Sequence, residues 1–333
     1  MSVFSTKLAA AVSTTLSTFF NLFEYPLRTL QRAVGVSRMG WLFVGPNLFI
    51  LALFTFIPIL INVWYSVTGG VELMPAARPY VGAENFAILL ECENYLEPQS
   101  CRKDIFWQAL FNTAKFSVLQ VSLMVFFALV TALVLNRKIL GRSFWRGVFF
   151  YPVLLSPVVV ALIWKWLLQT YGVFNAGLVG AGFEPVQWLI QRDWAFFWSL
   201  VVSIWAHMGF YTLILLAGLQ AIPKDMYEAA HMDGASPWRT LWRITLPLLM
   251  PNLLVVIILS MVKAVQVFDE VFVLTGGGPG SATTFVVQYI YQTGFAEQIH
   301  LYGLAAAASL MLAGCLMALT LLQWRVSNRK QTN

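Results

Sequence analysis

The sequence predicts an all-α membrane protein that crosses the bilayer several times, and three observations support this fold class. Of the 333 residues, 59% are apolar and only 11% are charged, whereas a soluble domain is about 25% charged. Six apolar stretches are each long enough, at roughly 20 residues or more, to cross the hydrocarbon core. The sequence also lacks the repeated ten-residue alternation of a membrane β-barrel. Together these features exclude most soluble enzymes and disordered chains.

The six stretches give the expected order of the spans. They cover residues 41–67, 113–135, 148–169, 196–220, 247–272 and 301–324. Pro46, Pro58, Pro152 and Pro157 each remove a backbone donor, so we expect kinks in the first and third spans. Residues 41–326 therefore form the predicted transmembrane domain, which residues 1–40 precede and a tail of residues 327–333 follows.

The segment before the first span predicts an amphipathic helix that lies in the membrane interface. Within residues 19–34, six side chains share one helical stripe, and Glu24, Arg28 and Gln31 lie opposite. The stripe contains Phe19, Phe23, Pro26, Leu27, Leu30 and Val34. A disordered tail is the alternative. The N-terminus lacks a long apolar run and a clear small-residue cleavage site, so it does not resemble a signal peptide.

The distribution of basic residues predicts the orientation of the spans. Fourteen lie on one side, namely Lys7, Arg28, Arg32, Arg38, Arg137, Lys138, Arg142, Arg146, Lys224, Arg239, Arg243, Arg325, Arg329 and Lys330. Five lie on the other, namely Arg78, Arg102, Lys103, Lys165 and Arg192. The positive-inside rule places the first side, with both termini, in the cytoplasm. The net charge of +6 is thus a sign of topology in a bacterial inner membrane and not of nucleic-acid binding.

The three cysteines fall into two groups. Cys315 lies in the sixth span, where we expect it to pack against its neighbours. Cys92 and Cys101 both lie in the predicted outside loop 68–110, nine residues apart. In an oxidising compartment this pair can form a disulfide, and two free thiols are the alternative. A zinc site is not expected, because no histidine lies nearby and two ligands are too few.

The connection after the fourth span predicts two short helices, over residues 223–244, that protrude into the cytoplasm. Pro223 suits the start of the first helix and Gly234 its end. Ser236 and Pro237 suit the cap and first position of the second. A partner could approach closely over small residues, between the charges of Glu228 and Asp233. From these residues alone, a simple linker between two spans is an equally good interpretation.

A longer pattern around this connection resembles the EAA signature of the permeases of ABC importers. Glu228, Ala229 and Ala230 are followed after three residues by Gly234, and then after nine residues by Ile244, Leu246 and Pro247. The resemblance implies the transmembrane fold of type I importers, also called the MetI-like fold. It further implies a coupling helix that docks on an ATPase subunit through Glu228, Ala229, Ala230, Asp233 and Gly234, while Leu246 and Pro247 begin the next span.

A glycine-rich segment after the fifth span narrows the resemblance. Residues 274–280 read Leu-Thr-Gly-Gly-Gly-Pro-Gly and precede Thr283 and Thr284. This segment is similar to the outside loop of the carbohydrate permeases of the maltose and glycerol-phosphate importers, in the version of the first, MalF-like subunit. The resemblance implies a heterodimer with a second permease, two ATPase subunits and a periplasmic solute-binding protein. The short loop 68–110 departs from the maltose protein, so no contacts to the binding protein carry over.

The chain lacks the motifs of catalytic sites. It contains no phosphate-binding loop with the lysine that ATP binding requires, and no nucleophile elbow around a serine. Its three histidines, His207, His231 and His300, lie on different segments, which argues against a metal site. We therefore expect no enzyme activity and no cofactor on this chain, with ATP and magnesium bound by the partner ATPase.

An ion-coupled secondary transporter or channel subunit is the main alternative, and a membrane enzyme or scaffold is the third. Secondary transporters place ionisable groups at mid-membrane and often contain repeats with broken helices. Here the span centres are nearly free of acids, because Asp269 and Glu270 lie near the outer end of the fifth span. His207 is the one candidate for a proton relay, although a hydrogen-bonded core histidine is the favoured interpretation.

The fourth and fifth spans supply the candidates for a solute path. Sugar sites combine hydrogen-bonding groups with aromatic faces. The candidates are Trp205, His207, Met208, Gly209, Tyr211, Thr212, Lys263, Gln266, Phe268 and Asp269. Gln266 is the preferred polar residue, because we expect its amide to be buried within an apolar run. The alternative is that the aromatic residues only pack or lie at the interface.

Overall fold

The structure, a computed structural model, describes residues 30–31, 35–101 and 104–331. The described chain forms two units, Met1–Asn62 and Val63–Asn333. The described residues form helices, and the one pairing of extended backbone is an isolated bridge between Thr68 and Tyr80. This confirms the predicted all-α class. Apart from residues 30–31, the predicted amphipathic segment 19–34 lies outside the described residues.

The first apolar stretch forms one continuous helical run. It consists of α2 (Val36–Leu51), a π-helical turn (Ala52–Phe56) and α3 (Ile57–Ser66). Pro58 lacks the N–H that would continue the regular pattern, and the π-turn ends two residues before it. The whole run from Arg38 to Ser66 is long and apolar enough to cross a membrane.

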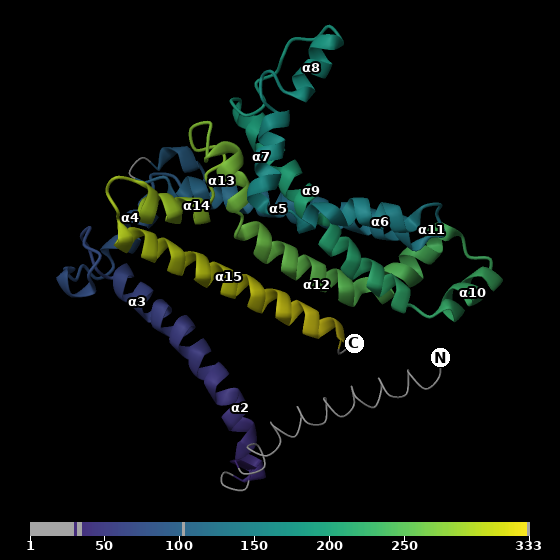
Figure 1. Ribbon diagram of the computed structural model, residues 1–333, viewed down its shortest axis with the longest axis horizontal. Helices are drawn as coiled ribbons and strands as arrows, with labels where there is room; N and C mark the ends of the chain where they lie inside the picture. Colours follow the sequence, from purple (N-terminus) through teal and green to yellow (C-terminus); the bar gives the residue numbers. More distant parts are fainter. Residues whose placement is uncertain (1–29, 32–34, 102–103, 332–333) are drawn as a thin grey trace, which may run out of the picture. The chain divides into compact units, whose positions relative to one another are not determined.

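Four more helices in the second unit meet the same length and apolarity criteria. They are α5 (Phe106–Asn136), α9 (Arg192–Ala221), the run Pro237–Val265 that contains α12 (Leu246–Val265), and the first 24 residues of α15 (Tyr302–Gln331). In Figure 1, α5, α9 and α12 lie alongside one another, and α15 lies beside α12. Each predicted span therefore has a helix near its expected position. The third span is sharply bent, and the fifth is divided into two helices.

The third predicted span is not one straight crossing. It consists of α6 (Arg142–Phe150) with a 3₁₀ turn (Tyr151–Leu154), followed by α7 (Pro157–Leu167), and the two parts are bent by 102°. Pro152 and Pro157 flank the break, so the expected kink is confirmed, but its size exceeds a kink within one span. The described residues contain five helices long and apolar enough to cross a membrane, or up to six if the bent pair counts as one span.

The fifth predicted span also ends earlier than expected. Helix α12 stops at Val265, and a separate short helix, α13 (Asp269–Thr275), follows after a three-residue break. The remaining short helices are α4 (Glu84–Leu90), α8 (Val173–Gly180), α10 (Lys224–Met232), α11 (Pro237–Thr240) and α14 (Val286–Tyr291), with 3₁₀ turns at Pro75–Ala77 and Pro98–Ser100 and π-turns at Leu241–Thr245 and Gln292–Ala296.

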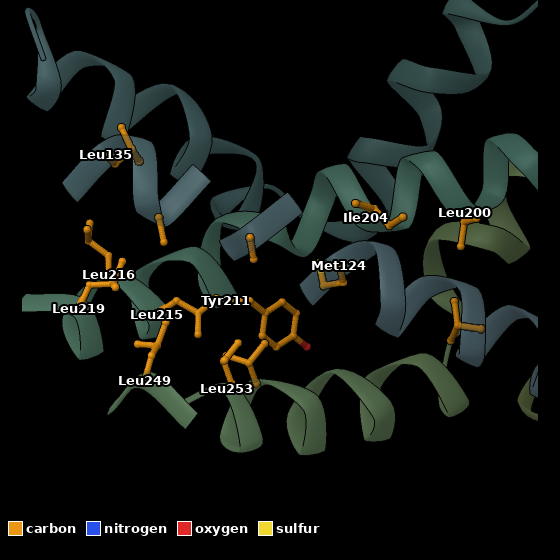
Figure 2. Close-up of a cluster of buried hydrophobic side chains, with 14 of the residues drawn as sticks. Met124, Leu135, Leu200, Ile204, Tyr211, Leu215, Leu216, Leu219, Leu249 and Leu253 are labelled. Carbon is orange, nitrogen blue, oxygen red and sulfur yellow. The ribbon is translucent and has the colours of Figure 1, made fainter. Parts of the chain in front are cut away.

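The main hydrophobic core lies where α5, α9 and α12 meet. Leucine side chains from α9 and α12 interdigitate around Tyr211, and Met124 lies on the facing side of α5 (Figure 2). Small residues let the helices approach closely, because a side chain on Gly209 of α9 would overlap the carbonyl oxygen of Phe149 in α6. The bundle is thereby packed along most of α9, the helix that leads into α10.

A buried arginine organises the loop between α3 and α4, near the start of α15. Arg78 donates to Oγ1 of Thr68 (2.9 Å) and to the carbonyl of Glu72 (2.6 Å), and its guanidinium lies 4.7 Å from the ring centre of Tyr65. Gly303, the second residue of α15, fits here because a Cβ would overlap the carbonyl of Thr68. Burial lowers the pKa of Arg78, but the ring faces and carbonyls around it stabilise its charge.

Candidate functional site

The two short helices predicted after the fourth span are present as α10 and α11. Gly234 has a φ of +66° and ends α10, and the Oγ of Ser236 accepts the backbone N–H of Arg239 at the start of α11. Both local predictions are confirmed, because only glycine adopts this left-handed conformation readily and serine is a preferred cap. We call the segment from Lys224 to Thr240 the knob (Figure 1).

Exposure divides the knob residues into two groups. Glu228, Ala229, Asp233 and Gly234 are exposed, whereas Ala230 is only 6% exposed. The carbonyl of Ala230 also accepts the N–H of Ala235, which closes the turn after α10. Ala230 therefore packs against its own chain. The exposed ridge carries the carboxylates of Glu228 and Asp233 with the small residues Ala229 and Gly234 beside them, and His231 and Met232 are exposed between the two acids.

The knob is linked to the segment before α12 and borders a cavity at the end of α5. The hydroxyl groups of Tyr227 and Thr245 lie 3.3 Å apart and join α10 to the π-turn before α12. A cavity of about 790 Å³ separates the knob from Leu133 and Asn136 at the end of α5. Helix α9 ends at Ala221 and α10 begins at Lys224, so only two residues separate them. A movement of the knob would therefore be passed to α9 through a linker of only two residues.

The glycine-rich segment forms a tight loop after α13. Gly276 and Gly277 both have positive φ angles, and a Cβ on Gly277 would lie 2.5 Å from Nε2 of Gln288. Thr283 donates to the carbonyl of Gly278 (2.8 Å), and Asn112 of α5 donates to the carbonyl of Ser281 (2.8 Å). The glycines are thus needed for both backbone conformation and space.

Half of the candidates on α9 are buried. Tyr211 and Thr212 are 4% and 2% exposed, because both face the core. Gly209 is buried against the backbone of α6. Trp205 is exposed, with its ring edge-on to Trp164 at 5.7 Å, and Met208 is half-buried. Gly209, Tyr211 and Thr212 are thus buried by packing in this structure, and their assignment to a solute path stays a prediction.

The candidates on the fifth span gather at the break between α12 and α13. Gln266 is exposed there, which corrects the expectation that it is buried, because the helix ends before it. Asp269 is also exposed, while Lys263 is half-buried. Phe268 stacks on Phe272 at 5.2 Å and contacts Tyr291 of α14 at 5.3 Å. Amide, carboxylate and aromatic groups therefore lie together at a helix break.

Sequence reasoning missed a buried polar network directly behind this break. Glu270 is 1% exposed, and its Oε1 accepts the hydroxyl of Ser203 in α9 at 2.9 Å. The Ser203 oxygen in turn accepts Nε2 of Gln120 in α5 at 3.0 Å. His207 lies with Nδ1 3.9 Å from the same Glu270 oxygen. Glu270 and Asp269 are adjacent in sequence. The structure shows that Glu270 is buried and Asp269 is exposed, and the sequence alone does not distinguish the two.

Comparison with known proteins identifies the family. The family model "Binding-protein-dependent transport system inner membrane component" matches residues 105–331. The chain belongs to this family. Its members are permease components of ABC importers, in which a separate subunit hydrolyses ATP. The matched region contains the knob, the glycine-rich loop and the buried network, and it begins at the start of α5.

Curated relatives of this permease cover nearly its whole length. The trehalose/maltose transport system permease protein MalF of Thermococcus litoralis is 36% identical over 291 residues, which is 87% of this chain and 94% of the relative. The lactose transport system permease protein LacF of Rhizobium radiobacter is 31% identical over 91% of this chain and 98% of its own. The sulfoquinovosyl glycerol permease SmoG of Agrobacterium fabrum is 33% identical over 81% and 84%.

Solved structures confirm the fold of this permease. A chain of a bacterial ABC transporter for import of the acidic polysaccharide alginate has a TM-score of 0.76 at 24% identity, covering 90% of this chain and 99% of that one. A second alginate transporter structure, in complex with a periplasmic protein bound to an alginate pentasaccharide, gives a TM-score of 0.75 at 23% identity, covering 90% and 97%. The MetI-like fold expected for the chain is therefore present.

The loop between α4 and α5 contains the predicted disulfide. Cys92 and Cys101 are bonded to each other, and their Cα atoms lie 4.4 Å apart. Cys315 is a free, exposed cysteine on α15. No group of histidine, cysteine and acidic residues within the described ranges could hold a metal ion. The bridge closes the loop that follows α4, so of the two alternatives for this cysteine pair the structure shows the disulfide.

Proposed function

We propose that this permease passes a carbohydrate, such as an oligosaccharide, a glycoside or a related polyol, into the cytoplasm. Support comes from the relatives named for trehalose, maltose, lactose and sulfoquinovosyl glycerol. The break between α12 and α13 adds chemical support, because Gln266 and Asp269 can bond hydroxyl groups and Phe268 offers an aromatic face. Trp205, His207, Met208 and Lys263 are further candidates for this path.

The observation that carries the coupling role is the exposed ridge of the knob. We propose that Glu228, Ala229, Asp233 and Gly234 dock on a partner ATPase, which binds ATP and magnesium. The small side chains of Ala229 and Gly234 allow close approach, and the two carboxylates can pair with basic groups on the partner. Ala230 supports this surface indirectly, because its buried side chain packs α10 against the rest of the chain.

The full transporter in this proposal contains a second, homologous permease, two ATPase subunits and a periplasmic binding protein. Both termini lie in the cytoplasm, in agreement with the charge distribution, and the knob faces the same side. The predicted boundaries follow: an interfacial segment 1–40, a transmembrane domain 41–326 with the outside loop 68–110 and coupling helices 223–244, and a tail 327–333. ATP binding would close the ATPases, push the knob and turn the solute path to the outside.

Reconstitution into proteoliposomes tests this function. The complete transporter should take up labelled maltose, trehalose or lactose only with ATP and binding protein, and a thermal-shift screen of the binding protein should select the same solute. Glu228→Ala should separate ATP hydrolysis from uptake while the complex still assembles. Matched substitution of Glu184, an exposed carboxylate on the opposite loop, should leave coupling intact. Uptake driven by an ion gradient without ATPase subunits would refute the proposal.

The solute path has its own test. Gln266→Ala and Phe268→Ala should raise the KM for uptake more than they lower the maximal rate, because they remove contacts to the solute and not to the ATPase. If both variants transport with unchanged KM, the break between α12 and α13 is not part of the path.

A further inference from the structure

A carboxylate buried inside an apolar helix bundle requires partners, because burial of an unpaired charge is costly. Glu270, in the first turn of α13, is 1% exposed. The Ser203 hydroxyl donates to its Oε1 (2.9 Å), and Gln120 donates to the Ser203 oxygen (3.0 Å). These two bonds join α13, α9 and α5 at one point within the bundle.

His207 extends the network by one turn along α9. Its Nδ1 lies 2.9 Å from the carbonyl oxygen of Ser203 and 3.9 Å from Oε1 of Glu270. A carbonyl oxygen can only accept a hydrogen bond, so Nδ1 carries the proton. In the neutral imidazole, Nε2 is then left as an acceptor. The bond to the Ser203 carbonyl thus orients this half-buried histidine beside Glu270, on the helix that carries Trp205.

Glu270 is well placed to transmit movement. It follows Asp269 and lies four residues after Gln266, the two exposed polar residues of the break. Its partner Ser203 lies on α9, which runs without interruption to Ala221 and is linked to the knob by two residues. In the described part of the chain, the later turn of α13 bonds instead to α7, where Lys165 donates to the carbonyl of Val273 (3.1 Å).

We propose that Glu270 is a positioning residue that couples α9 to the solute path. Its bond to Ser203 holds the first turn of α13, and with it Gln266 and Asp269, against α9. When the knob moves α9, the break moves with it and its exposure changes. This inference rests on the proposed coupling role of the knob, but it requires no particular solute.

The test measures exposure of the break in the assembled transporter. Cys315 is replaced by serine, the bonded pair Cys92–Cys101 is left unchanged, and Gln266→Cys provides the reporter. A membrane-impermeant maleimide is applied to the complex without nucleotide and to the complex trapped with ATP and vanadate. For this parent we expect labelling rates to differ by about fivefold or more between the two states, the range of typical coupling effects.

Variants of the network then decide the role of Glu270. Glu270→Ala and Ser203→Ala should each bring the ratio of labelling rates close to one, and the double variant should be no worse than either single one. Glu270→Gln should keep most of the ratio, because its amide oxygen can still accept from Ser203. Glu184→Ala, which removes an exposed carboxylate, should match the parent. Thermal unfolding of each complex separates lost coupling from lost stability.

Several results would overturn the inference. These are an unchanged ratio in Glu270→Ala, additive effects of the two alanine variants, or a Glu270→Gln variant as impaired as Glu270→Ala. If Glu270→Ala fails to assemble, Ser203→Ala decides the question, since it removes one hydroxyl and leaves the carboxylate. A parent complex without any nucleotide-dependent change in labelling would also overturn the inference, because the exposure of the break would then not follow the knob. Absence of sugar uptake alone would leave the labelling result standing.

Discussion

Gly209 and Phe149 meet backbone to backbone, because a side chain on Gly209 would overlap the carbonyl oxygen of Phe149 and its Cβ would lie 3.0 Å from the Cα of Phe150. This contact brings α9 and α6 closer than any larger residue would allow. Glycine at such a position allows close packing of the two helices.

Gly209→Ala should therefore destabilise the bundle by about 1–3 kcal/mol, the usual cost of overpacking a well-packed core. The expected result is a lower unfolding temperature and a lower yield of the assembled complex. Gly177→Ala is the matched control, because Gly177 lies in helix α8 with open space around it. That variant should be neutral or slightly stabilising. Equal behaviour of the two variants would contradict the close contact.

Gly277 combines a positive φ of +95° with a steric limit set by Gln288, whereas Gly280 has a positive φ of +60° and open space. Alanine at either position carries the backbone cost of roughly 1–2 kcal/mol for the left-handed region. Gly277→Ala should cost more than Gly280→Ala, because it also displaces Gln288 and Thr284. Unfolding temperatures of the two variants measure the difference, and a larger loss for Gly280→Ala would show that the loop is held differently.

The disulfide predicts a specific labelling pattern. The denatured, unreduced chain should take up one alkyl group, at Cys315, and the reduced chain should take up three. Replacing Cys92 and Cys101 by serine should lower stability by about 2–3 kcal/mol, the entropic effect expected for so short a loop. Uptake of three groups before reduction, in protein exported to an oxidising compartment, would contradict the bridge.

Asp104, at the start of α5, should make the stability of the folded protein depend on pH. Burial raises the pKa of its carboxyl, although hydrogen bonds from the N–H of Phe106 and the hydroxyl of Tyr289 oppose the shift. A raised folded-state pKa means that this contribution to stability is complete below about pH 3.8, the ordinary value. It is lost as pH rises through the raised value.

Asp104→Asn removes the titrating group and keeps an oxygen that can accept the N–H of Phe106. Relative to the parent, the variant should therefore gain in unfolding temperature between pH 4 and pH 8, since only the parent pays the cost of a buried carboxylate. Thermal unfolding across this range measures the difference between the two proteins, in which the other groups cancel. A difference that is flat with pH, or that falls, would show that Asp104 is not desolvated.

The sequence could predict those local features whose backbone conformation only a few residue types favour. Gly234 and Ser236 were identified at the correct ends of α10 and α11 because the left-handed region and the N-cap each favour few residues. The apolar stretches located the spans for a similar reason, since length and composition suffice in a bilayer. Pro152 and Pro157 predicted a kink but not a bend of 102°, which depends on what α6 and α7 pack against.

Whether a given side chain faces the core or the surface was harder to predict from the sequence. Gln266 is exposed directly after the end of α12, whereas its neighbours Val265 and Val267 are only 7% and 1% exposed. Asp269 and Glu270 are adjacent and chemically alike, yet one faces outward and the other inward. In an apolar span, hydrophobic periodicity does not mark the buried face, so Tyr211 and Trp205 could not be distinguished beforehand.

The contact between Gly209 and Phe149 has one more consequence for α9. Gly209 lies well inside this 30-residue helix, away from both ends. A stiff rod that is held tightly at an inner point swings its two ends in opposite senses. Displacement of the end at Ala221 would therefore tilt the end at Arg192 the other way, with Gly209 as the fulcrum. On this geometry, closing on one side of the membrane and opening on the other are a single movement that requires no bending of the helix.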